Sequence, residues 1–388
     1  MKHYHQNPFQ YVKFNQLALY GLTVFVLSLF LQDVNAAEFT KRGILTTNVE
    51  YDSNPALSDN NEDPVWIYSL TPQLQIDATN ELNRWFLDGA LLIQRYSNVR
   101  TLVEREDPRL TFGWDRTYES GLFGIRANYQ ENTSRTSELT ATGVFNDKNG
   151  TQKTKSLEAR WQREITSRWS VLNEAIYGDY KFTDAGGLSS YSVSEIRSKL
   201  SYANTEKLNT YTQLGYSHYM PKQQLDNTDF VRINFGGDYQ LTELFNYGAY
   251  AGAYKISGQQ SDTGWEAGLK TRYDSNERMS YLVELSRSLG AGGVGGFQKS
   301  DALKLSGIYI VSDKDTTGLD YSLNKSKQDN QINVVAVDYQ QLGVFYERKL
   351  TNNWQARLTA VHKQVDSSSV SARASVFGIA LIYDTLSF

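Results

Sequence analysis

The sequence predicts an all-β fold, a transmembrane up-and-down antiparallel β-barrel of about eighteen strands, with about sixteen also possible. Three observations support this prediction. From Lys41 to Phe388, segments of about ten to fifteen residues alternate apolar and polar side chains. The connections between these segments alternate between short and long. The last residue, Phe388, is an aromatic that would lie on the lipid-facing side of the final strand.

The N-terminal residues differ from the rest of the chain. Lys2 and Lys13 give a basic start, residues 17–31 are an uninterrupted apolar run, and Val34-Asn35-Ala36 fits the small-residue cleavage rule. An apolar core of about fifteen residues suits a signal peptide and is short for a spanning helix. We therefore expect a cleaved signal peptide over 1–36 and a single barrel domain over 37–388. The alternative is a permanent N-terminal anchor helix.

The segment 264–274 shows how the alternation sets the register. One face carries Trp265, Ala267, Leu269 and Tyr273, and the other carries Glu266, Lys270, Arg272 and Asp274. A slip of one residue would turn Lys270 and Arg272 into lipid, at about 2–4 kcal/mol each near the midplane. A soluble β-sandwich would show the same alternation with its polar face outside, so the connections must decide between the two folds.

Two segments depart from a regular pattern. Pro72 lies within 65–77 and lacks a backbone N–H group, which predicts a bulge or weak pairing there. In 332–350 the apolar positions change parity between Tyr339 and Leu342, which predicts a second bulge.

The connections favour a membrane barrel. Short turns are expected at 78–82, 118–120, 165–168, 204–207, 241–244, 274–278, 312–315 and 349–353. Longer polar connections are expected at 53–64, 97–107, 131–152, 183–189, 220–227, 257–262, 289–299, 326–330 and 365–368. Such alternation is typical of a barrel with turns at one end and loops at the other, and is not expected of a Greek-key sandwich. Both termini then lie at the turn end, which we expect to face the periplasm.

The short turns also share a composition. They repeat a Thr or Asn followed by an aromatic residue, as in ATNELNRW, EITSRW, LTELFNY and KLTNNW. Aromatic residues flank the turns at Trp85, Phe123, Trp169, Phe245, Tyr281 and Trp354, and Trp66 and Trp265 lie at the opposite strand ends. Two aromatic belts at the two interfaces of a bilayer are the expected anchors of a barrel.

Most catalytic and cofactor chemistry is disfavoured. The net charge of −4 argues against nucleic-acid binding, and the absence of Cys excludes thiol catalysis and Cys-ligated metals. Gly290-x-Gly292-x-x-Gly295 is followed by another strand instead of the helix that a dinucleotide site needs, so we interpret it as a flexible loop. His218 and His362 share parity with lipid-facing neighbours. We expect no enzyme, no cofactor and no metal site. The acidic loop 52–63 is more simply a solvated loop than a cation site.

The remaining candidate site is the lumen. Its predicted pore-lining residues are polar and of both signs, which suits water and hydrophilic solutes. They are Arg126, Glu158, Arg160, Glu195, Arg197, Arg232, Asp238, Glu266, Lys270, Arg272 and Arg357. The alternative interpretation is that these residues pair with one another and fill the interior.

The chain resembles the outer-membrane β-barrel porin-like proteins associated with exopolysaccharide and capsule operons. The resemblance rests on TTNVEYDSNPALS followed by WIYSLTPQLQID, the length after the leader, and the terminal Phe388. It implies a location in the outer membrane of a Gram-negative-type envelope and a role in passing or securing an extracellular polysaccharide. Phe388 resembles the signal that the barrel-assembly machinery reads. The expected partners are outer-membrane lipid and lipopolysaccharide, this machinery, and a polysaccharide export system.

Two classes of function therefore stay open. One is a polar-lined channel for hydrophilic solutes, including a part in exopolysaccharide export. The other is a non-conducting structural or binding barrel that anchors a surface polymer or a partner protein.

Overall fold

The computed structural model describes residues 37–59, 63–98, 102–142, 150–223, 226–258, 261–330, 333–367 and 370–385. The predicted signal peptide over 1–36 and the terminal Phe388 lie outside these residues. Within them, no helix is long and apolar enough to cross a membrane.

The described chain is built from eighteen strands and one helix. The strands are β1 (Glu38–Asp52), β2 (Val65–Thr79), β3 (Asn83–Tyr96), β4 (Arg105–Tyr118), β5 (Gly121–Thr133), β6 (Thr151–Glu164), β7 (Trp169–Thr183), β8 (Tyr191–Ala203), β9 (Leu208–Pro221), β10 (Thr228–Gln240), β11 (Phe245–Ser257), β12 (Asp262–Asn276), β13 (Met279–Ala291), β14 (Phe297–Ile310), β15 (Asp315–Asn330), β16 (Asn333–Lys349), β17 (Trp354–Ser367) and β18 (Ser371–Asp384). The helix α2 (Ser134–Thr142) lies between β5 and β6.

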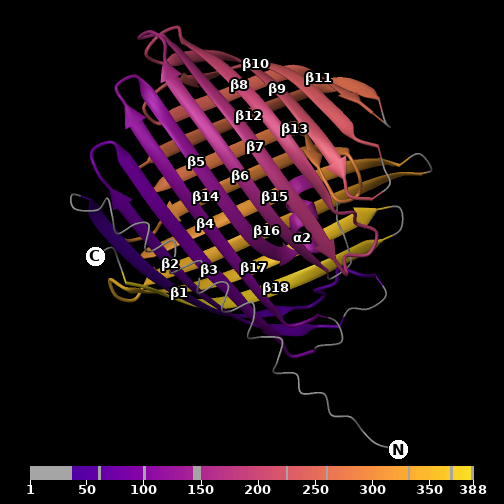
Figure 1. Ribbon diagram of the computed structural model, residues 1–388. Helices are drawn as coiled ribbons and strands as arrows, with labels where there is room; N and C mark the ends of the chain where they lie inside the picture. The colour runs from indigo at the N-terminus through magenta and orange to yellow at the C-terminus, as the bar shows by residue number, and fades with distance from the viewer. Residues whose placement is uncertain are drawn as a thin grey trace, which may run out of the picture.

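The strands form one closed sheet. Each pairs antiparallel with its neighbours in sequence, and β1 pairs with both β2 and β18, from Ile44↔Asp384 to Asp52↔Val376. Because the ladder closes on itself, no strand keeps a free edge, which is the only way that strands can satisfy their backbone groups in lipid. Figure 1 shows the strands of the near and far walls crossing at a steep angle, with α2 inside the outline of the barrel. The predicted eighteen-stranded antiparallel barrel is confirmed.

The predicted register is also confirmed in β12. Trp265, Leu269 and Tyr273 are 55%, 37% and 44% exposed, whereas Glu266 on the opposite face is 1% exposed. A closed barrel puts one strand face outside and the other toward the lumen, so the exposed apolar face is the outer one. His218 and His362 share the parity of the outer-face residues Leu214 and Leu358, as expected.

At one end of the barrel the turns are short. Most of them are stabilised by hydrogen bonds between a side chain of the turn and its own backbone. Thr166 Oγ1 accepts the N–H groups of Arg168 and Trp169 at 3.2 and 3.1 Å, and Thr351 Oγ1 does the same for Asn353 and Trp354 at the same distances. A short polar side chain that bonds its own backbone replaces the missing ladder partners. This explains why the turns repeat Thr before an aromatic residue. We call this end the turn end, and the opposite end the loop end.

Aromatic rings gather along the turn end. Trp85 stacks on Trp114 with centroids 5.3 Å apart, Trp169 lies 4.6 Å from Tyr202, and Trp354 lies 4.8 Å from Tyr383. The predicted belt at this end is therefore present, extended by rings on the neighbouring strands.

Three sequence predictions concern strand irregularities and loop lengths. The ladder between β2 and β3 keeps its register but skips Thr71 and Pro72, as predicted for a proline. The bulge predicted between Tyr339 and Leu342 is wrong, because β16 pairs continuously with both neighbours there. A register shift lies instead in β12, between Asp274 and Asn276. Two predicted long connections, 326–330 and 365–368, are largely strand.

Candidate functional site

The inner face of the barrel carries a compact charged network on β8, β10 and β12. Glu195 accepts hydrogen bonds from Arg197 Nε at 2.6 Å and from Arg232 Nη2 at 2.7 Å. Asn234 Nδ2 donates to the carboxylate of Glu266, which lies 4.0 Å from Arg232 Nη1. The network joins strands that are two places apart in the sheet. These predicted pore-lining residues therefore lie together and are paired with one another.

A second group lies on β4, β5 and β6. Arg160 Nη2 donates to Asp115 Oδ1 at 3.0 Å, and Arg126 lies directly opposite Glu158 in the ladder. The guanidinium of Arg126 lies 5.4 Å from the ring centroid of Phe86, within the range of a cation–π contact.

The other four predicted residues lie apart from these groups. Lys270 pairs with Glu284 at 2.6 Å and Arg272 with Asp274 at 3.0 Å, and both cations are more than half exposed. Arg357 pairs with Glu347 at 3.0 Å, and Asp238 is exposed. All eleven predicted residues lie on strands. Their role as the lining of a conducting pore stays a prediction.

The helix α2 extends into the lumen, and its first residue is linked through Gly150 to a buried ion pair. Arg105 and Asp107 form a two-pronged ion pair at 2.8 and 2.9 Å, with both side chains at most 8% exposed. Arg105 Nη1 also donates to the carbonyl of Gly150 at 3.3 Å. That carbonyl accepts the N–H of Ser134, the first residue of α2, at 2.9 Å. The connection 131–152, expected as a long polar loop, therefore starts by folding inward.

The far side of α2 meets the tip of the β13–β14 hairpin, residues 292–296. The N–H of Gly293 donates to Glu138 Oε2 of α2 at 3.1 Å. The hydroxyls of Tyr191 and Tyr219, on the inner face of β8 and β9, donate to the carbonyls of Ala291 and Gly292 at 3.1 Å each. Because β9 and β13 are four places apart in the sheet, the tip must bend inward across β10–β12 to make these bonds.

A third inward segment is the acidic loop after β1. Leu57 is buried in an apolar cluster with Tyr339, Val365 and neighbours on β16–β18, and Leu139 of α2 packs against the same cluster. The start of this loop is stabilised by a local hydrogen bond, in which the Asn54 backbone N–H donates to the side-chain Oδ1 of Asp52 at 3.0 Å. Among the described residues, no three His, Asp or Glu side chains are grouped as a metal site would need.

We call the loop 53–58, α2 and the tip 292–296 the lumen segments. Together they connect β1, β5–β6, β8–β9, β13–β14 and β16–β18 within the loop end of the barrel. Burial in this setting raises the pKa of the Glu138 carboxyl to about 7, against the opposing effect of the bond from Gly293.

The lumen segments were not foreseen from the sequence. The glycine-rich run 290–296 was interpreted as a flexible loop, and it is instead a packed tip in which Gly295 and Gly296 adopt φ of +107° and +71°. A Cβ atom at Gly293 would meet Phe182 at 2.6 Å. One signal was available: the loop-end halves of several strands carry aromatic residues on the polar parity, such as Tyr191 and Tyr219.

Comparisons with known proteins agree with the fold. No family model and no curated protein sequence matches the chain. The structure of OpdK, an outer membrane protein from Pseudomonas aeruginosa, matches with a TM-score of 0.51 and 9% identity, over 90% of this chain and 99% of that chain. OccAB4 from Acinetobacter baumannii gives a TM-score of 0.51 and 8% identity, over 92% and 100%. OccAB3 from the same organism gives 0.50 and 7%, over 89% and 99%. At such identities the likeness is one of fold.

Proposed function

We propose that this protein is an outer-membrane channel for hydrophilic solutes, and that the lumen segments constrict it. The observation that carries the proposal is the inner face, where charges of both signs line a closed barrel whose outer face is apolar. Such a lining lowers the cost of moving a hydrated solute through the membrane without favouring one charge. The likeness of fold to an outer membrane protein supports the location. No catalytic step is part of this proposal.

Conductance across a planar bilayer tests the proposal directly. Lys270 and Arg272 are two exposed cations of the inner face, and the double variant Lys270→Gln/Arg272→Gln removes the cation from the pairs with Glu284 and Asp274. We expect the reversal potential in a salt gradient to shift toward cation selectivity. The matched control is Lys325→Gln, which removes a cation from the outer face. A protein that carries no current in any form would contradict the channel.

The constriction has its own test. Replacing residues 134–142 with a Gly/Ser linker of equal length removes the contacts of Glu138 and Leu139 but leaves every strand. We expect a several-fold larger single-channel conductance with unchanged heat-modifiable migration on a gel. An unchanged conductance would mean that α2 does not limit flow.

The alternative function is a non-conducting barrel that binds or anchors a polymer or partner. The observation that favours it is the mutual pairing of the inner charges together with the packed lumen segments. If the linker variant conducts and the wild type does not, α2 blocks the lumen of the wild-type barrel. The non-conducting function is then favoured.

A part in exopolysaccharide export is the finer form of the channel proposal. It is supported by the resemblance to proteins of exopolysaccharide operons. An extended saccharide chain would have to pass α2, so we expect added polysaccharide to block current in the wild type with a longer dwell time than in the linker variant. Equal blocking of both would argue against passage of a polymer.

The orientation and assembly of the barrel complete the proposal. We propose that the turn end and both termini face the periplasm. Because the chain has no Cys, a single Asp226→Cys at the loop end should react with an impermeant reagent on intact cells, whereas Asn352→Cys at the turn end should not. Deleting Phe388 should lower the folded fraction if the barrel-assembly machinery reads it.

A further inference from the structure

One sector of the outer face, over β12–β15, is hollowed toward the loop end. The ladder between β12 and β13 stops at Ala267↔Arg287, although β12 starts at Asp262 and β13 continues to Ala291. The strands separate there because the β13–β14 tip bends into the lumen. The result is a groove of about 510 Å³.

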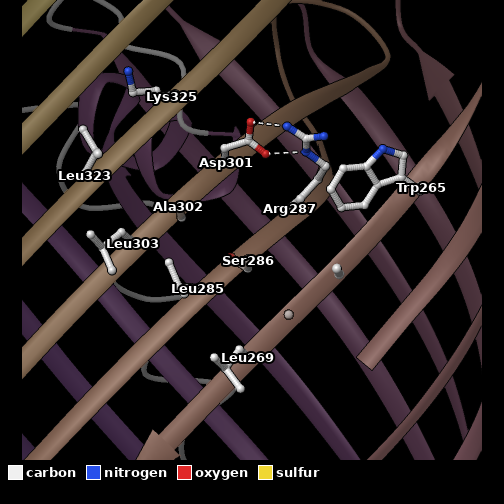
Figure 2. A pocket seen from close by; sticks show the side chains of 12 residues that line it. Trp265, Leu269, Leu285, Ser286, Arg287, Asp301, Ala302, Leu303, Leu323 and Lys325 are labelled. Carbon is white, nitrogen blue, oxygen red and sulfur yellow. Dashed lines mark hydrogen bonds and ion pairs between the residues drawn. The ribbon is translucent and has the colours of Figure 1, made fainter. Parts of the chain in front are cut away.

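The floor of this groove is apolar. Residues from four adjacent strands line it, as Figure 2 shows, and they are Trp265 and Leu269 on β12, Leu285 on β13, Leu303 on β14 and Leu323 on β15. The ladders place Leu269, Leu285, Leu303 and Leu323 in one row across the sheet. All lie on the outer face, where the barrel meets acyl chains.

A row of charges lies directly above that apolar row, toward the loop end. The ladders align Arg287, Asp301, Lys325 and Asp338 on the same outer face. Arg287 binds Asp301 through Nε at 2.6 Å and Nη2 at 2.7 Å, and its guanidinium lies 4.1 Å from the ring centroid of Trp265. Lys325 pairs with Asp338 at 2.9 Å. Figure 2 shows Arg287 and Asp301 together at the edge of the groove.

Charged side chains on the outer face are tolerated only near the polar headgroups, because they are costly in the hydrocarbon region. The row therefore marks the headgroup level in this sector. Lys327, next on this face of β15, is exposed and interacts electrostatically with Asp301. The row with Lys327 thus has three cations and two carboxylates. Asp301 takes the Nε–Nη2 edge of Arg287, so Nη1 is available to an additional acceptor.

We propose that this groove binds a phosphorylated glycolipid of the outer leaflet, of the lipid A class. An acyl chain lies on the leucine floor, and a phosphate accepts hydrogen bonds from Arg287 Nη1 and from the ammonium groups of Lys325 and Lys327. Phosphate oxygens are strong acceptors for guanidinium and ammonium donors. The excess of positive charge favours an anionic headgroup. The inference rests on the proposed outer-membrane location with the loop end outward, and it does not require that the barrel conduct.

Native mass spectrometry of the purified protein with added lipid A tests the site. The double variant Arg287→Gln/Asp301→Asn removes one charge of each sign, so the net charge of the row stays the same. We expect its affinity for lipid A to fall about tenfold, and that of Lys325→Gln/Lys327→Gln to fall at least as far. Leu303→Trp should block the floor and reduce binding without changing any charge.

The matched control is an outer-face pair outside the groove. Lys153 Nζ lies 3.0 Å from Glu131 Oε1 on β6 and β5, so Lys153→Gln/Glu131→Gln removes one charge of each sign there and should leave binding unchanged. Equal loss in this control, no loss in the groove variants, or equal binding of a neutral two-chain lipid would each overturn the site. Heat-modifiable migration verifies that each variant is folded. Conductance is measured separately in bilayers without glycolipid, so failure of the channel proposal would be seen independently.

Discussion

The turn end and the loop end of this barrel are built differently. At the turn end each connection has at most four residues, and in most of these turns a Thr, Ser or Asn side chain accepts local backbone N–H groups. At the loop end the connections reach across the lumen, and the contact between Gly293 and Glu138 joins residues 155 positions apart. The comparison teaches that the turn end is defined by local sequence, whereas the loop end depends on contacts made only after the barrel closes.

The first prediction has the largest expected effect on stability, and it compares two ion pairs, one at each end of the barrel. Arg105→Ala should lower the free energy of unfolding by about 3–5 kcal/mol, because Asp107 is left buried without a counter-charge. Arg84→Ala, which breaks the exposed pair with Asp77 at the turn end, should cost about 0–1 kcal/mol. Urea unfolding in lipid vesicles measures both. Equal losses would mean that the buried ion pair near the start of α2 stabilises the barrel no more than an exposed pair does.

This contrast also explains which parts of the fold could be predicted. Strand number, register and turn positions follow from alternation and turn chemistry, which are properties of neighbouring residues. The rule that apolar side chains point to lipid fails at the loop end, where Tyr339 is buried on the inner face against Leu57. Counting Tyr339 as outward produced the false bulge before Leu342. The inner face is apolar there because the lumen segments cover it.

For the candidate site too, the sequence predicted properties of single strands but not contacts between distant parts of the chain. Alternation identified charged residues on the inner face of the strands, such as Glu195 and Arg232. It could not give their pairing, because Glu195 and Arg232 lie on strands that are two places apart in the sheet. The inward folding of α2 was missed for the same reason: a nine-residue polar helix has no strong pattern of its own, and its position depends on Gly150, Gly293 and the apolar cluster around Leu57.

The second prediction concerns pH and the loop end alone. Below about pH 4.5 the Glu138 carboxyl is neutral in both docked and released α2, so docking is strongest. Between there and about pH 7 the released carboxyl loses its proton and the docked one keeps it. Docking therefore weakens as pH rises, by at most about 3 kcal/mol. Among the described residues, the groups that interact with Glu138 include the Gly293 N–H and the hydroxyls of Tyr191 and Tyr219.

Conductance should consequently rise between pH 5 and pH 8. Glu138→Gln, which keeps a neutral side chain throughout, should remove this dependence and stay at the low-pH level. Glu164→Gln, an exposed acid at the turn end, should leave the dependence intact. A pH profile that is the same in wild type and Glu138→Gln would separate Glu138 from any control of the lumen.

A matched pair of glycines gives the third prediction. A Cβ atom at Gly150 would meet the Cα of Ala185 at 2.4 Å and its N at 2.6 Å, so backbone must move in Gly150→Ala. In Gly307→Ala the new atom meets only the Tyr281 ring, at 3.6 Å. We expect a loss of about 1–3 kcal/mol and a higher conductance for Gly150→Ala, and little change for Gly307→Ala. Equal effects on conductance would show that the packing beside α2 is looser than the structure indicates.

The smallest effect is expected at the turn end, where single hydrogen bonds can be removed one at a time. Thr351→Val and Thr166→Val each keep the shape of the side chain and remove the acceptor for two backbone N–H groups. Because these N–H groups are exposed and water can replace the lost acceptor, each variant should cost about 0.5–1.5 kcal/mol in urea unfolding. The two turns lie on different hairpins, so the double variant should equal the sum of the singles within about 0.5 kcal/mol. Neither variant should change conductance or its dependence on pH, since no described residue of the turn end contacts the lumen segments. A change in either property would mean that the two ends are coupled through the strands, and the contrast between local turns and long-range loops would then fail.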